Sequence, residues 1–109
     1  MLASALGKNP PLGIIVTPSS INETDPTCPL TSQTISGGAF GGEPSYSYAW
    51  DWQVGGGGLV INSPSSQTTT VTVTGNSGSR SGTLRCTVTD QVPDNAADTC
   101  SVVMECGLA

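Results

Sequence analysis

Residues 44–58 read PSYSYAWDWQVGGGG, and aromatic side chains fall on every second position of this stretch. Four of the five aromatic residues of the chain are here: Tyr46, Tyr48, Trp50 and Trp52. Side chains two positions apart lie on the same face of a β-strand, so the segment is predicted to be a strand with one aromatic face. At about 25 cal/mol per Å² of buried apolar surface, this face is the largest contribution to a core that the chain offers. We therefore expect it to line the core, with Trp50 the most deeply buried and Tyr46 or Trp52 at an edge.

The composition of the 109 residues predicts a single all-β domain. Hydrophobic residues make up 36% of the chain and charged residues 10%, while there are 14 Gly and 8 Pro. Threonine, valine and isoleucine are clustered between turn signals, which favours a threonine-rich β-structure over disorder. Such a chain is long enough to bury one modest core.

Seven segments between glycine and proline signals are predicted to be strands. They lie within residues 13–20, 31–42, 45–54, 58–66, 67–76, 82–90 and 97–106, whereas residues 21–30 are predicted to be irregular. Residues 1–13 are predicted to form an extended N-terminal arm and residues 14–109 the β-sandwich. The side chains predicted for the core are Tyr48, Trp50, Val71, Val73, Leu84, Cys86, Val88 and Val102.

The charge balance argues against two classes of partner. The net charge is −5, with only three basic side chains. Nucleic-acid binding needs several Lys or Arg residues on one face, and an anionic membrane surface needs the same, so neither partner is predicted. The chain has no apolar run near the ~20 residues that span a bilayer. The opening segment MLASALGKNPPLG lacks the order of charged and apolar regions of a signal peptide, which predicts synthesis in the cytoplasm without export.

The residue inventory does not predict an enzyme, and no cofactor is expected. The chain has no histidine, its only lysine lies in the predicted arm, and Asp51 is the one carboxylate within a clear strand. Asp90, Asp94, Asn95 and Asp98 share one interstrand loop and offer the oxygen ligands that Ca²⁺ prefers. Their spacing matches no EF-hand loop, so a solvated turn is the preferred interpretation and no metal site is predicted.

Three segments together resemble a known family. The stretches GGEPSYSYAWDW, GTLRCTVTD and ADTCSVVM are similar to the PKD-type, immunoglobulin-like β-sandwich over roughly residues 31–105. The resemblance implies a two-sheet sandwich of about seven strands. This chain departs from the family pattern after the aromatic strand, where QVGGGG replaces the usual Gly-Asp-Gly, so any turn or metal-binding role of that acidic residue does not carry over.

The four cysteines allow more than one interpretation. There is no C-x-x-C pair and no histidine, so zinc is not expected. The thiols are either small buried hydrophobes or partners in one or two disulfides formed in an oxidising medium. The resemblance implies a Cys28–Cys86 bond, because Trp50 between them matches the immunoglobulin Cys…Trp…Cys order. Cys86–Cys100 and Cys28–Cys106 remain as alternatives.

The resemblance and the missing reactive groups leave two hypotheses of different classes. The first is a structural accessory protein of a larger assembly, a decoration or cement protein on a bacteriophage capsid or tail, made in the host cytoplasm and located in the virion. Its partners would be other protein subunits, contacted by the arm residues Leu2, Leu6, Pro10, Pro11 and Leu12.

The alternative is a carbohydrate-binding or adhesion module of a secreted or surface protein, with an extracellular location. In that case Trp52 or Tyr46 would stack on a sugar ring. The two hypotheses are compatible, because a virion surface domain can also make a weak glycan contact of this kind. For the assembly hypothesis, Thr70, Thr72 and Thr74, which share one face of the fifth predicted strand, would supply a lateral contact. The preferred interpretation of these threonines is a polar sheet face in water.

Overall fold

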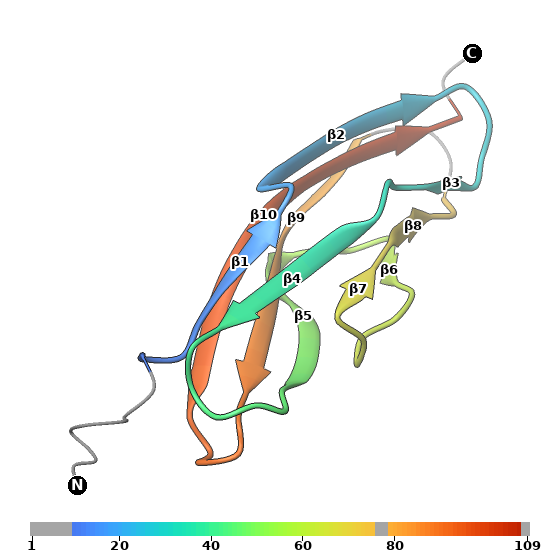
Figure 1. The fold of residues 1–109 in the computed structure, drawn as a ribbon. Coiled ribbons are helices and arrows are strands. Elements are labelled where there is room, and N and C mark those ends of the chain that lie inside the picture. Colours follow the sequence, from blue (N-terminus) through green and yellow to red (C-terminus); the bar gives the residue numbers. More distant parts are fainter. Residues whose placement is uncertain (1–9, 76–78, 108–109) are drawn as a thin grey trace, which may run out of the picture.

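The protein is all-β in the computed structural model, which describes residues 10–75 and 79–107 (Figure 1). The predicted all-β class is therefore confirmed. The described residues form the strands β1 (Gly13–Thr17), β2 (Ser20–Asp25), β3 (Leu30–Thr31), β4 (Ile35–Phe40), β5 (Ser47–Gly55), β6 (Leu59–Ile61), β7 (Thr68–Thr69), β8 (Val71–Val73), β9 (Ser79–Thr89) and β10 (Asn95–Cys106). Among these residues there is no helix long and apolar enough to cross a membrane.

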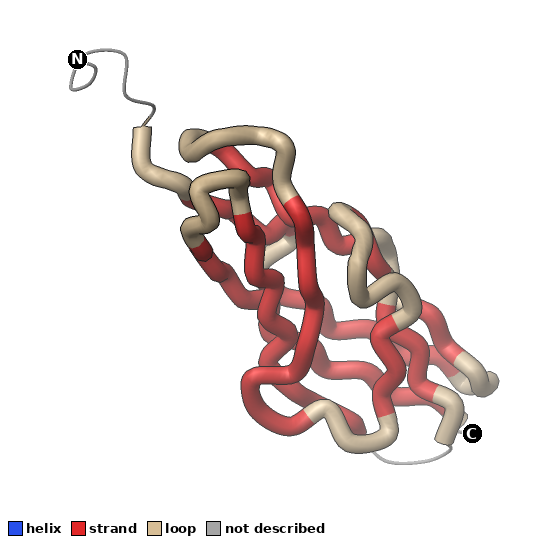
Figure 2. The backbone as a smooth tube through the Cα atoms, turned by 90° about the horizontal axis from the view of Figure 1, so that it is seen from below, coloured by secondary structure: helices blue, strands red, loops and turns tan. Residues whose placement is uncertain are grey.

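The strands form one four-stranded sheet and two short three-stranded sheets. The large sheet has the order β2-β10-β9-β5, and the short sheets have the orders β1-β4-β7 and β3-β8-β6. The short sheets lie end to end, because β3 leads into β4 and β7 leads into β8 along the chain (Figure 1). Figure 2 shows the strands wrapped around a common interior, an arrangement consistent with a β-sandwich.

The first predicted strand is divided between two sheets. Thr17 is the last residue of β1, which pairs antiparallel with β4. After Pro18 the chain crosses to the large sheet as β2, which runs parallel to β10 from Ser20 opposite Ser101 to Asp25 opposite Cys106. Proline has no N–H for a sheet ladder, so the change of partner sheet falls at this residue. The prediction that residues 21–30 are irregular is therefore wrong for the part that forms β2.

The aromatic strand β5 lines the core on one side, as its alternation predicts. Trp50 is only 4% exposed, while Tyr46, Tyr48 and Trp52 are partly buried against the core. Trp50 also fixes the β6–β7 loop, because its backbone N–H donates to the Pro64 carbonyl at 2.8 Å and its indole Nε1–H to the Ser66 carbonyl at 2.6 Å. The edge of the large sheet is covered at this point.

Seven of the eight side chains predicted for the core are buried. They are Trp50, Val71, Val73, Leu84, Cys86, Val88 and Val102. Tyr48, the eighth, is only partly buried, since β5 is an edge strand and a phenol keeps its hydroxyl near water. Burial raises the pKa of Tyr48. Additional core residues come from β1, β2, β4, β6 and β10: Ile14, Val16, Ile21, Ile35, Leu59, Cys100, Met104 and Cys106.

Candidate functional site

A cleft of about 400 Å³ lies at the end of the sandwich where the described chain begins. Three segments surround it: residues 10–12, here called the arm root, the β4–β5 loop and the β9–β10 loop. Its lining consists of Pro10, Pro11, Leu12, Gly42, Glu43, Asp90, Val92 and Asp94. The cleft therefore combines apolar walls from the arm root and Val92 with carboxylates from the two loops.

The arm root is attached to the body by a close backbone contact. The Gly42 N–H donates to the Pro10 carbonyl at 2.8 Å. Gly41 has φ of +68°, and a Cβ at this position would collide with the Pro11 carbonyl, so the approach requires glycine. The Tyr46 hydroxyl donates to the Gly41 carbonyl at 2.7 Å and ties this loop to the aromatic segment. The path by which the chain leaves the domain is set by these contacts.

Asp90 joins the two loops of the cleft. Its Oδ2 accepts from the Glu43 N–H at 2.9 Å, and its Oδ1 accepts from the N–H groups of Val92 at 3.0 Å and Asp94 at 2.7 Å. These donors, the Asp94 N–H most of all, hold the pKa of the buried Asp90 carboxyl below its usual value. The carboxylate is used inside the protein, so its function here is to shape the cleft wall.

Two other polar side chains considered for a calcium loop, those of Asp98 and Asn95, also have partners within the protein. Asp98 Oδ2 accepts from the Val16 N–H at 2.8 Å, and Asn95 Oδ1 accepts from the Thr89 hydroxyl at 2.8 Å. In the described parts of the chain, no three His, Cys, Asp or Glu side chains are grouped so that they could hold a metal ion.

Some large apolar side chains are exposed to solvent, and one of them lies in the cleft. Five such residues are exposed among those described: Ile15, Phe40, Val54, Val60 and Val92. Val92 lines the cleft itself and is 58% exposed. Phe40 is opposite Gly13 and Ile15 opposite Gly38 in the β1–β4 ladder, so both side chains stand on one sheet face beside glycines. Ile15, Phe40 and Val92 are here called the arm-root surface.

Ile15, Phe40 and Val92 were not among the residues predicted from the sequence. The predicted anchor consists of five arm residues, of which Leu2 and Leu6 lie outside the described residues. Pro10 and Pro11 are exposed and line the cleft, whereas Leu12 is partly buried against the core. In the sequence, Phe40 is marked only by its position at the end of a glycine-rich strand. The face of the sheet that its side chain occupies depends on its pairing with Gly13.

The two aromatic residues considered for sugar stacking are partly buried. A Cβ at Gly56 or at Gly82 would collide with the indole of Trp52, so this ring packs against both glycines. The hydroxyl of Tyr46 is used in the bond to Gly41. Neither residue belongs to the large hydrophobic side chains that are exposed.

The threonine face carries hydrogen bonds within its own sheet. Asn62 Nδ2 donates to the hydroxyl oxygens of Thr70 at 2.9 Å and Thr72 at 2.8 Å. The hydroxyls of Thr72 and Thr31 lie 2.9 Å apart in a further hydrogen bond. These contacts link β3 and β8 with the residue after β6, and they give the threonines a structural use.

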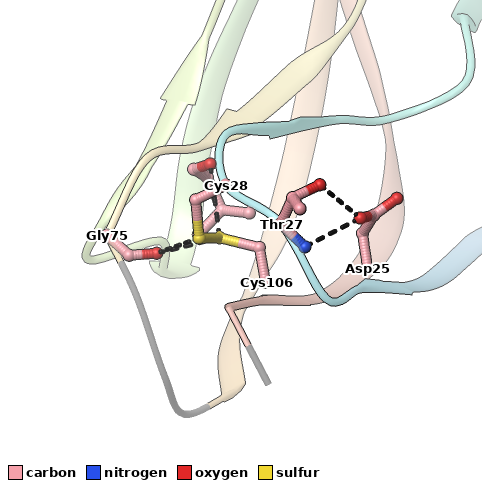
Figure 3. Close-up of a disulfide and its surroundings, with 6 residues drawn as sticks. Asp25, Thr27, Cys28, Gly75 and Cys106 are labelled. Carbon is pink, nitrogen blue, oxygen red and sulfur yellow. Dashed lines mark hydrogen bonds between the residues drawn. A yellow bond between two sulfur atoms is a disulfide. The ribbon is translucent and has the colours of Figure 1, made fainter. Parts of the chain in front are cut away.

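The disulfide joins Cys28 to Cys106, so the Cys28–Cys86 bond implied by the resemblance is wrong (Figure 3). The parallel pairing of β2 with β10 places Asp25 opposite Cys106, and the following turn brings Cys28 to a Cα–Cα distance of 5.2 Å. Thr27 holds that turn, because its N–H and its hydroxyl donate to Asp25 Oδ1 at 2.9 and 2.8 Å. These two bonds lower the pKa of the Asp25 carboxyl.

The remaining cysteines, Cys86 and Cys100, are buried free thiols in adjacent strands. Burial raises the pKa of each to about 11. They therefore remain protonated at neutral pH and pack as small hydrophobes.

Comparisons of this chain with protein-family models, with curated proteins and with solved structures find no match.

Proposed function

We propose that this protein is a non-enzymatic structural accessory protein of a large assembly, of the kind that decorates or cements a bacteriophage capsid or tail. The observation that carries the proposal is the arm-root surface. Among the five exposed large apolar side chains of the described chain, Val92 lines the cleft, and Phe40 and Ile15 share the exposed face of the β1–β4 ladder that follows the arm root. Exposed apolar residues gathered in one region are typical of a surface that a protein partner covers.

The arm and this surface would act together. The Pro10–Gly42 hydrogen bond directs the chain out of the domain beside the cleft. A partner subunit that binds residues 1–9 is therefore brought against Phe40 and Val92. Contact through an arm and a small apolar area adds binding surface without enlarging the core of the sandwich.

We further propose that the sandwich is immunoglobulin-like, in keeping with the PKD-type resemblance. The support is the order of the strands. When β1–β2, β3–β4 and β7–β8 are each counted as one interrupted strand, the described chain has seven units, and the short sheets join into the order first, second, fifth, fourth. The large sheet holds the third, sixth and seventh units together with β2, the second part of the first unit. The ABED and CFG sheets of an immunoglobulin domain have the same division of their seven strands.

The proposed location is the virion, after synthesis in a host cytoplasm. Cytoplasmic thiol systems keep cysteines reduced, so the Cys28–Cys106 bond would form after the particle is released into an oxidising medium. The disulfide joins the β2–β3 connection to the last residue of β10. Figure 1 shows that β2 and β10 end on the side of the sandwich remote from the start of β1. Reduced and oxidised protein should therefore present the same arm-root surface.

Co-sedimentation with the particle fraction of the source tests the proposal. Four forms are compared: the full chain, a truncation lacking residues 1–9, Phe40→Ser, and Val60→Ser as the control. Phe40 and Val60 are 49% and 50% exposed, so both substitutions remove an equally exposed apolar side chain from different surfaces. We expect the full chain and Val60→Ser to pellet with the particles, and the truncation and Phe40→Ser to remain in the supernatant.

Two results would count against the assembly function. If the full chain never pellets with the particles, the assembly function is refuted. If Phe40→Ser and Val60→Ser lose co-sedimentation equally, the arm-root surface is not the contact. If the full chain stays soluble but binds a glycan array, the carbohydrate-binding alternative is favoured instead. Circular dichroism of each form confirms that the comparison is made between folded proteins.

A further inference from the structure

Arg80 lies at the end of the sandwich opposite to the arm root. It is the second residue of β9, which runs from this end toward the β9–β10 loop of the cleft (Figure 1). Its partner across the ladder is Met104 of the core, so the Arg80 side chain starts on the inner face of the large sheet. The guanidinium is thus placed where the two layers of the sandwich end.

The guanidinium of Arg80 has no ion-pair partner in the described part of the chain. Its Nε is buried and makes no hydrogen bond, and it is the only buried side-chain nitrogen or oxygen of the described residues in that state. The two terminal nitrogens do not share this burial and remain open to solvent. Arg85 shows the contrast, since its Nε and Nη2 donate to the two carboxylate oxygens of Asp51 at 3.0 and 2.6 Å.

Two glycines pack closely against the guanidinium of Arg80. A Cβ at Gly58 would lie 2.9 Å from Nε and 3.3 Å from Cζ, and a Cβ at Gly75 would lie 3.2 Å from Nη2. Any larger residue at these positions would push against the guanidinium. Gly58 also has φ of +79° in the Gly56–Leu59 turn, a conformation that favours glycine. The guanidinium is therefore packed between two backbone segments before any ligand arrives.

We propose that Arg80 and the turn at Gly57–Gly58 form an oxyanion site that takes a carboxylate or phosphate group carried by a binding partner. A guanidinium that is already positioned binds such groups through charge-assisted hydrogen bonds from its planar fork. Among the described residues, no backbone hydrogen bond uses the amide N–H of Gly57 or Gly58, and these groups extend the set of donors. A Cβ at Gly57 would meet nothing within 4 Å, so the turn is open to a ligand.

The oxyanion site is independent of the proposed assembly function. It uses no residue of the arm-root surface and lies at the other end of the domain. The chain has a net charge of −5, so a partly buried cation that has no carboxylate partner among the described residues is a local exception on an acidic protein. A partner with one correctly placed anionic group would be oriented at this end.

Nuclear magnetic resonance of the full, oxidised ¹⁵N-labelled chain tests the site directly. Sodium phosphate and sodium acetate are titrated separately at pH 7 and constant ionic strength, with sodium chloride as the balancing salt. We expect saturable shifts of the Arg80 Nε–H and of the amides of Gly57 and Gly58, and none at the Arg85 Nε–H. Tighter binding of phosphate assigns a phosphate group as the natural ligand, and tighter binding of acetate assigns a carboxylate.

The variants Arg80→Gln and Arg85→Gln form a matched pair. Loss of the guanidinium at position 80 should weaken the binding of the preferred anion at least about tenfold, the amount expected for a hydrogen bond to a charged group, while the variant at position 85 binds as the wild type does. If Arg80→Gln does not fold, Arg80→Lys keeps the charge and should still bind more weakly, because it lacks the planar fork. Absence of a saturable shift at Arg80 in the wild type, or equal shifts at Arg80 and Arg85, would overturn the proposal.

Discussion

Breaking the Cys28–Cys106 disulfide should cost the fold a large part of its stability. The two cysteines are separated by 78 residues in sequence. A cross-link that closes a loop of this length lowers the entropy of the unfolded chain by about 15 cal/mol/K. This entropy loss stabilises the folded state by about 4.5 kcal/mol at about 25 °C. Domains of this size are stable by only about 5–15 kcal/mol, so the reduced protein should be marginally folded.

Urea unfolding followed by tryptophan fluorescence measures this loss, because the buried Trp50 becomes exposed on unfolding. Wild type is compared with and without a phosphine reductant, and with the double variant Cys28→Ala/Cys106→Ala. Cys106 is 1% exposed, so the double variant should lose additional packing and be less stable than the reduced wild type.

The reductant should leave the stability of the double variant unchanged, since its remaining cysteines, Cys86 and Cys100, are free thiols. This variant therefore serves as the control for effects of the reductant that do not involve the disulfide. A decrease of less than about 1 kcal/mol on reduction of the wild type would refute the loop-entropy reasoning. A decrease of equal size in the double variant would refute the assignment of the effect to this bond.

Three further predictions concern the titratable groups. Cys86 and Cys100, with pKa values of about 11, should resist a thiol reagent at pH 8 in the native state and react as two thiols per chain in denaturant; rapid native modification would contradict their burial. The folded pKa of Asp90 is depressed, so its contribution to stability is present above its ordinary value near 3.8 and is lost as pH falls through the folded value. Asp90→Asn should therefore be less stable than wild type at pH 7 and less sensitive to acid in thermal melts, and an unchanged acid slope would contradict this linkage. Asp51→Asn should leave the urea midpoint almost unchanged, because the Asp51–Arg85 pair is solvent-exposed, and a large shift would show that the pair is more than a surface contact.

Local alternation predicted the strands whose own residues carry the pattern. In β5 and β9 the buried positions follow the period of two, and Trp50, Leu84 and Val88 are buried as their spacing indicates. Such a pattern is visible in the sequence because one face of a strand meets the core along its whole length. β2 lacked this signal, since Ile21 is its only fully buried side chain and its partner strand is distant in sequence.

The residues of the candidate site were only partly accessible from sequence. Pro10 and Pro11 were identified as arm residues, and they do line the cleft. Phe40 and Val92 were missed because nothing in their sequence neighbourhood distinguishes an exposed hydrophobe from a buried one. The face on which Phe40 lies follows from its pairing with Gly13, which is a contact between segments far apart in the chain.

The sequence by itself determined the all-β class and the aromatic face in the core, because these properties depend on residues close together in the chain. The pairing of Cys28 with Cys106 and the position of Arg80 between Gly58 and Gly75 were decided by the tertiary structure. Both depend on which strands are neighbours and in what register, and a shift of one residue would turn each side chain to the opposite face. Long-range register sums weak contributions from many residues, so no short motif in the chain encodes it.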